Sequence, residues 1–165
     1  MSLETLDAAV FYFFAALALI SALGVVAQRN PIYSAFSLIV TMCSLSAIFG
    51  LLGSPLIAAL QVIVYAGAIM VLFLFVLMLL NVEADEPHEG RGLRVVAVLL
   101  ALVLVAQVGS VLAGAGTRLA SGFDASTRAV ARVLFEPRFA YAFEATSVLI
   151  LAALVGAVLL AKKDL

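Results

Sequence analysis

The sequence predicts an all-α, polytopic membrane protein with five transmembrane helices. Of its 165 residues, 66% are apolar and only 12% are charged, and the mean hydropathy is +1.27. A soluble domain of this size could not hide so much apolar surface, so the composition indicates a membrane protein. The apolar residues also gather into five separate runs of transmembrane length.

These runs predict a single integral membrane domain over residues 1–165, with spans at about 8–27, 32–52, 56–80, 93–115 and 143–161. A loop at 81–92 and a longer connection at 116–142 separate the last three spans. The acidic start MSLETLD lacks the positive region of a signal peptide, so we expect the first run to be a retained helix. Cys43 stands alone in an apolar run, which predicts a buried structural thiol and no disulfide or zinc framework.

The second and third spans are expected to form an antiparallel hairpin that is fully immersed in the bilayer. No charged residue lies between Asn30 and Val82. Pro31 suits the first turn of a helix, and residues 53–55, Gly-Ser-Pro, predict a tight turn between the two spans. Small hydroxyl residues allow close helix packing and hydrogen bonding, so we expect the second span to lie among other helices. They are Ser34, Ser37, Thr41, Ser44 and Ser46.

The third span has two different halves. In its first half, Gln61 and Tyr65 lie four residues apart on one face, just before the run Ala-Gly-Ala at 66–68. Gly67 is a poor helix former and leaves the backbone open to a close approach, whereas residues 69–80 are bulky throughout. We therefore expect one half to deform or pack against another backbone. Gln61 and Tyr65 can bond to a neighbouring helix or hold a water, and interhelical bonding is the simpler interpretation.

The two polar connections differ in character. The first contains residue types that bind metals, but their spacing matches no ligand pattern, so a solvated loop is the favoured interpretation. These residues are Glu83, Asp85, Glu86, His88 and Glu89. In the second connection, Arg128 and Arg132 share one helical face while Val130, Val133 and Leu134 share the other. This pattern predicts a short interfacial helix.

An odd number of spans places the two termini on opposite sides of the membrane. One side, with the C-terminus, carries Arg29, Arg91, Arg94, Lys162 and Lys163. The other side carries the arginines of the long connection, Arg118, Arg128, Arg132 and Arg138. Charges in short loops and beside span ends count more, so we predict an N-terminus outside and a C-terminus in the cytoplasm.

The sequence contains no nucleotide-binding motif, no cysteine cluster, no basic tract for nucleic acid and no carboxylate or basic residue in the middle of a span. An ion carrier that works alone normally needs such a residue at depth. The nearest candidate is Glu144, at the start of the fifth span. Its simpler interpretation is a carboxylate that complements the helix dipole. The functional interpretation is a polar contact or a member of a proton path completed by other chains.

Three stretches resemble subunit J of the bacterial proton-translocating NADH:quinone oxidoreductase, the counterpart of the mitochondrial complex I chain numbered six. They are NPIYSAFSLIV, AALQVIVYAGAIMVLFLFVLMLLN and LFEPRFAYAFEATSVLILAALVGAVLL. The resemblance covers the second, third and fifth spans with their turns, and its middle stretch is highly specific. The first span, the fourth span and both polar loops carry little of the family's signature.

The resemblance implies a non-catalytic five-helix subunit in the membrane arm, in the bacterial inner membrane. Its partners would be the quinone-binding subunit and the small antiporter-like subunits. NADH, FMN, iron–sulfur clusters and quinone would be bound by other chains, and no catalytic, cofactor or metal site is implied here. The Phe143–Glu144 pair also matches the start of the family's fifth helix.

The resemblance further implies a π-bulge in the third helix, near the run YAGAIM. In this sequence the run consists of Tyr65, Ala66, Gly67, Ala68, Ile69 and Met70. A change between bulged and regular helix there would couple quinone chemistry to proton movement. A glycine flanked by alanines fits this implication, because it makes a change of helical register sterically easy.

Two other functions remain open at the level of the sequence. One is a membrane subunit of a multisubunit cation/proton antiporter, whose chains are related in design. The other is an autonomous small efflux transporter. The missing intramembrane charge and the lack of an internal repeat disfavour the transporter.

Overall fold

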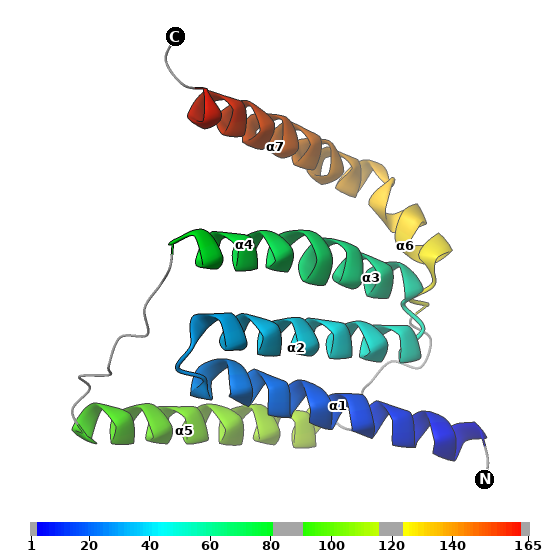
Figure 1. Ribbon diagram of the computed structural model, residues 1–165. Helices are drawn as coiled ribbons and strands as arrows, with labels where there is room; N and C mark the ends of the chain where they lie inside the picture. The colour runs from blue at the N-terminus through cyan, green and yellow to red at the C-terminus, as the bar shows by residue number, and fades with distance from the viewer. Residues whose placement is uncertain (1–2, 81–90, 116–123, 163–165) are drawn as a thin grey trace.

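The computed structural model describes residues 3–80, 91–115 and 124–162, and all the regular elements in these ranges are helices (Figure 1). They are α1 (Leu3–Ala27), α2 (Pro31–Leu51), α3 (Pro55–Leu60), the π-helix η1 (Gln61–Ile69), α4 (Met70–Leu80), α5 (Arg91–Ala115), α6 (Thr127–Leu134) and α7 (Pro137–Ala161). Successive long helices run in opposite directions, so the N-terminus and the end of α7 lie at opposite ends of the molecule (Figure 1).

Four helical segments are long and apolar enough to cross a membrane: Thr5–Ala27, Pro31–Leu51, Pro55–Leu80 and Pro137–Ala161. The third of these is continuous through α3, η1 and α4. Helix α5 contributes a shorter apolar stretch, Val95–Val111. The predicted class, an all-helical polytopic membrane protein, is confirmed, with four such segments among the described residues.

The largest difference from the predicted boundaries is at the last helix. The sequence analysis places residues 137–142 in the long connection, but α7 already begins at Pro137. Proline suits the first helical position because its φ is fixed near the helical value and it has no N–H to leave unpaired. The long connection is therefore shorter than expected. The short helix predicted around Arg128 and Arg132 is present as α6, which Ser126 caps by accepting from the Ala129 N–H at 3.3 Å; its interfacial location stays a prediction. The residues of the predicted loop before α5, 81–90, lie outside the described residues.

Helix α2 is the centre of a three-helix layer, with α1 on one side and the α3–η1–α4 segment on the other (Figure 1). Apart from Met70, the side chains buried between these helices are small: Ala18, Ala35, Thr41, Ser44, Ser46 and Ala66. Ser44 is only 1% exposed. Because lipid tails are as apolar as leucine, membrane helices associate by close packing of small residues. The expectation that the second span lies among other helices is confirmed.

Hydroxyl groups connect α2 to both of its neighbours. Ser21 Oγ lies 2.8 Å from Thr41 Oγ1, Ser34 Oγ donates to the Val25 carbonyl at 2.6 Å, and Ser46 Oγ donates to the Ala58 carbonyl at 2.7 Å. A Cβ added to Gly24 would lie 3.3 Å from Ser37 Oγ, so α1 and α2 approach closely there. Interhelical bonds of this kind each contribute about 0.6 kcal/mol in a bilayer. Together they fix the position of α2 against its two neighbours.

The turn from α2 into α3 is set by a glycine in a left-handed conformation. Gly53 has φ +75°, which residues with a side chain rarely adopt. Its N–H donates to the Gly50 carbonyl at 3.1 Å, and the Ser54 N–H donates to the Phe49 carbonyl at 3.0 Å. These two bonds form a Schellman motif, and Pro55 then occupies the first position of α3. The predicted tight turn is confirmed.

Neither α5 nor α7 packs closely against the three-helix layer in the part of the chain that the structure describes. Helix α7 packs on α6, where the rings of Phe135 and Phe143 meet edge to face at 5.1 Å. Not one residue of the apolar window of α7 is buried, whereas 22% of the window of α2 is. Both α5 and α7 therefore present nearly all of their apolar surface to their surroundings.

Cys43 is exposed, which contradicts the expectation of a buried thiol. Its neighbours along α2, Thr41, Ser44 and Ser46, take the positions that face α1 and α3. Cys43 falls on the remaining face of α2, which no other described helix covers. An apolar stretch in a membrane protein does not by itself imply burial, because the outward surface is apolar as well.

The close packing of α2 leads to a test of stability. Ala35 is 2% exposed, so Ala35→Leu should overpack the layer and destabilise it by about 1–3 kcal/mol. Ala16→Leu adds the same atoms on an exposed part of α1 and serves as the control. With the chain coexpressed with its expected partner subunits, we expect the amount of it recovered in monodisperse complex from membranes to fall for Ala35→Leu only. Equal losses for both variants would contradict the packing described here.

Candidate functional site

The hydrogen-bond pattern of the third long helix changes in its middle. Residues Pro55–Leu60 are α-helical, Gln61–Ile69 are π-helical and Met70–Leu80 are α-helical again. In a π-helix each N–H bonds to the carbonyl five residues earlier, instead of four. At the end of the segment, the Met70 N–H is directed to the carbonyls of Tyr65 and Gly67. The carbonyl of Ala66, which would accept this bond in an α-helix, loses its usual donor.

The π-helical segment overlaps the run that the sequence analysis singled out. Tyr65, Ala66, Gly67, Ala68 and Ile69 lie inside it, and Met70 is the first residue of α4. The segment begins four residues earlier than Tyr65, at Gln61. Residues 61–64 contain neither glycine nor proline, so no helix-weakening residue marks the start of the π-helix in the sequence.

Gln61 connects the start of the π-helix to α2. Its Nε2 donates to the Sδ of Met42 at 3.1 Å. A thioether is a weak acceptor, yet in hydrocarbon it is better for an amide than no partner at all. Gln61 was expected either to bond to a neighbouring helix or to hold a water. In the structure it bonds to the neighbouring helix α2.

The segment has one face against α2 and one face directed outward. Ala66 and Met70, four residues apart, are 7% and 6% exposed and pack towards α2. The side chain of Tyr65 is 51% exposed, and Gly67 and Ala68 are exposed as well. The outward face is therefore available to other chains. Unlike Gln61, the side chain of Tyr65 makes no hydrogen bond to α2.

Gly67 is constrained by its own helix and not by a neighbouring one. A Cβ built on Gly67 would lie 3.1 Å from the carbonyl oxygen of Val62, and no other helix in the described ranges approaches within 4 Å. The expected close approach of a neighbouring backbone is thus not made within this chain. Val62 precedes Gly67 by five residues, so the close contact is made within the π-helical segment itself. A side chain at position 67 would require the Val62 carbonyl to move by a few tenths of an ångström.

Glu144 lies far along the chain and in a different part of the structure. It is an exposed residue of α7, at the edge of a shallow pocket formed with Phe135, Pro137, Ala140, Tyr141 and Phe143. Because α7 does not pack on η1 in the described residues, the structure does not bring Glu144 together with Gln61 or Tyr65.

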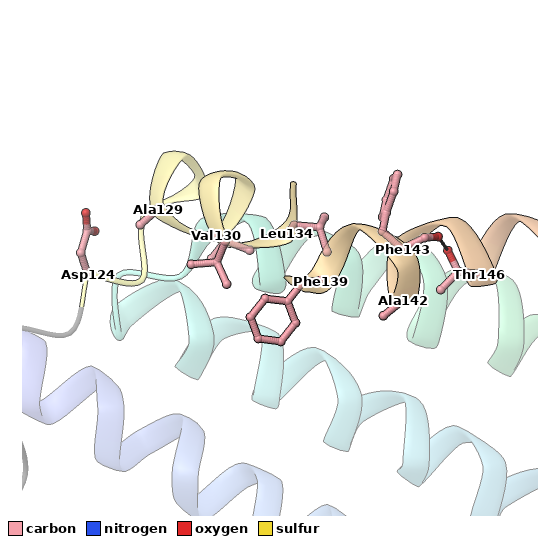
Figure 2. A pocket seen from close by; sticks show the side chains of 9 residues that line it. Asp124, Ala129, Val130, Leu134, Phe139, Ala142, Phe143 and Thr146 are labelled. Carbon is pink, nitrogen blue, oxygen red and sulfur yellow. Dashed lines mark hydrogen bonds between the residues drawn. The ribbon is translucent and has the colours of Figure 1, made fainter. Parts of the chain in front are cut away.

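An apolar groove of about 430 Å³ lies between α6 and α7 (Figure 2). Its polar groups already have partners, since Thr146 Oγ1 donates to the Phe143 carbonyl at 2.6 Å and Asp124 Oδ1 accepts from the Ser126 N–H at 2.9 Å. The bonds from Ser126 and the charge of Arg132 hold the pKa of Asp124 below its ordinary value. The groove offers hydrocarbon surface and an ionised carboxylate at its rim. Its lining residues are Asp124, Ala129, Val130, Val133, Leu134, Phe139, Ala142, Phe143 and Thr146.

Within the described ranges, no three or more His, Cys, Asp and Glu side chains gather closely enough to hold a metal ion. The metal-binding residue types of the first polar connection, from Glu83 to Glu89, lie outside the described residues.

Comparison with known proteins gives matches that span most of the chain. The family model of NADH-ubiquinone/plastoquinone oxidoreductase chain 6 matches residues 21–160. NADH-quinone oxidoreductase subunit J of Pseudomonas aeruginosa is 39% identical over 160 residues, which cover 93% of this chain and 96% of that protein. Subunit J of Escherichia coli strain K12 is 38% identical over 153 residues, which cover 89% and 82%. NAD(P)H-quinone oxidoreductase chain 6 of Synechocystis is 37% identical over 159 residues, which cover 94% and 80%.

These matches include α2, the π-helical segment, α5, α6 and nearly all of α7. They are not confined to one apolar helix, where composition alone can produce similarity. The names of these relatives also disfavour an antiporter subunit and an efflux transporter. The chain belongs to the family of subunit J, or chain 6, of NADH-quinone oxidoreductase, and is a membrane-arm subunit of respiratory complex I.

Proposed function

We propose that this chain helps to couple quinone reduction to proton translocation through a change of register in its third membrane helix. The observation that carries the proposal is the π-helical hydrogen bonding of Gln61–Ile69 between two α-helical segments. π-helical segments cluster at functional sites because they can be converted to α-helix by exchanging a few backbone bonds. We take this segment to be the π-bulge that the family resemblance implies.

The conversion would move α4 and leave α3 in place. If the Met70 N–H moved from the Tyr65 carbonyl to the Ala66 carbonyl, the following residues would turn by about 100° about the helix axis. Met70 would then leave its buried position against α2. Two bonds to α2 hold the first part of the helix, from Gln61 to Met42 and from Ser46 to the Ala58 carbonyl. Because the first part of the helix is held to α2, α4 would be the part that rotates.

In this proposal the chain is non-catalytic, and other subunits bind NADH, FMN, the iron–sulfur clusters and quinone. Cys43 is its single cysteine, whereas an iron–sulfur cluster needs several ligands, usually four cysteines. The groove between α6 and α7 offers apolar surface and no unpaired donor for a quinone carbonyl. We propose that the partners of the chain are the quinone-binding subunit and the small antiporter-like subunits, which cover α5, α7 and the outward face of η1.

We also propose that α5 is the fifth span, with the N-terminus outside and the C-terminus in the cytoplasm. Helix α5 has 25 residues, about 37 Å at 1.5 Å per residue, which exceeds the hydrocarbon core. The alternating directions of the long helices in Figure 1 agree with an odd number of crossings. The basic residues after α1, at the start of α5 and after α7 favour a cytoplasmic location for the end of α1, the start of α5 and the end of α7.

The proposed register change is tested at Gly67. In Gly67→Val, the new Cβ would crowd the Val62 carbonyl at 3.1 Å, and the branched side chain would restrict χ1. We expect the complex to assemble at least in part, with NADH:quinone turnover and proton pumping per assembled complex falling together. Turnover per complex is measured with the membrane-bound complex quantified separately.

Leu79→Val serves as the control for this variant, because Leu79 is exposed in the α-helical part of the same span. It should leave turnover per complex unchanged. If Gly67→Val lowers the amount of complex but leaves turnover per complex normal, Gly67 is a packing residue and the moving-helix proposal fails.

The orientation is tested with single cysteines in a Cys43→Ser background. Ala125→Cys, just before α6, should react with a membrane-impermeant maleimide in intact cells. Lys162→Cys, at the end of α7, should react only after the membrane is opened, because the chain ends on the cytoplasmic side. The reverse pattern of labelling would overturn the orientation.

A chain with so much uncovered apolar surface should not be stable without its partners. Expressed alone, it is expected to be degraded or to aggregate, whereas coexpression with the other membrane-arm subunits should protect it. The measurement is size-exclusion chromatography in mild detergent. A monodisperse, folded monomer obtained without any partner would argue strongly against the subunit assignment.

A further inference from the structure

Helix α5 carries one polar side chain in the middle of its apolar stretch, the amide of Gln107. Gln107 is four residues beyond the midpoint of Arg91–Ala115, or about 6 Å along the helix axis. The hydrocarbon core extends about 15 Å to each side of the bilayer centre. If α5 is the fifth span, as proposed above, the amide lies well inside the hydrocarbon.

The Gln107 amide has no partner within the described part of the chain. Its side chain is exposed, and the hydrogen bond at this residue is made by its backbone carbonyl, which accepts from Ser110 Oγ at 2.7 Å. An amide has two donor hydrogens and one acceptor oxygen, and its side chain is too short to reach the membrane surface from this depth. Lipid tails cannot bond to it, so a position facing lipid would leave the amide unsatisfied.

Gln61, the other side-chain amide inside a proposed membrane span, differs from Gln107 because it has a hydrogen-bond partner. Gln61 reaches Met42 on the adjacent helix of the same chain. No helix of the described chain packs closely on α5, so no described helix of this chain offers a partner to the Gln107 amide. The cost of an unpaired amide in hydrocarbon favours a protein helix over lipid as the cover of this face.

The surface around Gln107 has the form of a helix-packing stripe. Together with Leu104, Val108 and Val111 it lines a shallow hollow along one side of α5. These positions follow the spacing i, i+3, i+4 and i+7, which places them on one helical face. Membrane helices pack by inserting side chains into such hollows.

We propose that this face of α5 binds a transmembrane helix of another complex I subunit, which offers a hydroxyl, amide or carboxyl group to the Gln107 amide. Since the structure describes this chain alone, the partner is identified by its chemistry: a spanning helix with one hydrogen-bonding side chain at the depth of Gln107. The apolar residues of the stripe provide the packing, and the amide fixes the register of the two helices.

The test uses the assembled complex in native membranes and a photoreactive residue, p-benzoylphenylalanine, in place of Val111 or, separately, Leu102. Val111 lies on the stripe, whereas Leu102 lies on the opposite side of α5 and is similarly exposed, at 60% against 65%. We expect the probe at Val111 to cross-link to another subunit, and the probe at Leu102 to do so several-fold less. Adding Gln107→Leu should lower the cross-link from Val111 several-fold.

A probe at Val111 that reacts with lipid alone, or equal cross-linking from both positions, would overturn the proposal. So would a cross-link that Gln107→Leu leaves unchanged. Copurification of the unmodified chain with the complex is measured in parallel. If that copurification fails, α5 has no partner subunit and the assignment to complex I fails with it; if it succeeds, a negative cross-link refutes this inference alone.

Discussion

The backbone of a membrane-spanning segment has to satisfy its own hydrogen bonds, and the rest of this structure follows from that constraint. Water is absent from the hydrocarbon core, so each unpaired N–H or carbonyl there costs several kcal/mol. A helix meets this requirement because its N–H and carbonyl groups bond to one another within the segment. Every regular element in the described ranges is a helix. A spanning helix can still vary by exchanging one internal acceptor for another. The proposal assigns that form of freedom to the segment Gln61–Ile69, because its π-helical bonds and the α-helical alternatives use the same backbone groups.

A change of register needs a fixed reference, and α2 provides it. Its small side chains allow α1 and the third span to approach closely, and its hydroxyl groups bond to both neighbours. The bond between Gln61 and Met42 holds the start of the π-helix to this reference. Beyond it, Ala66 and Met70 contact α2 through apolar packing alone, which can be exchanged for similar packing at little cost. The two halves of the span therefore differ in the kind of contact that they make with α2, and the proposed movement belongs to the half with apolar contacts alone.

Much of the fold could be predicted from the sequence, because composition and turn chemistry are local properties. The apolar runs, Pro31 and the Gly53 turn place the first three long helices correctly. The start of α7 was misplaced because residues 137–142 were assigned to a polar connection, although Pro137 can begin a helix. The exposure of Cys43 was also mispredicted, since hydrophobicity does not separate an interior face from a lipid-facing one.

The candidate site was only partly predictable. Gly67 drew attention to the right part of the third span, but the crowded atom near it is the Val62 carbonyl of the same helix and not a neighbouring backbone. The start of the π-helix at Gln61 depends on the register of the whole span, which no single residue encodes. The proposed contacts of α5 and α7 with other subunits likewise depend on chains whose sequences are separate from this one.

The central claim is that the third helix changes register when the complex works. The most direct measurement is the structure of the assembled complex, at a resolution that shows carbonyl orientations, at rest and during turnover with NADH and quinone. The account predicts two states of the segment: one in which the Met70 N–H bonds to the Tyr65 carbonyl, and one in which it bonds to the Ala66 carbonyl and Met70 has left α2. A segment that keeps the bond from Met70 to Tyr65 under all conditions would contradict it.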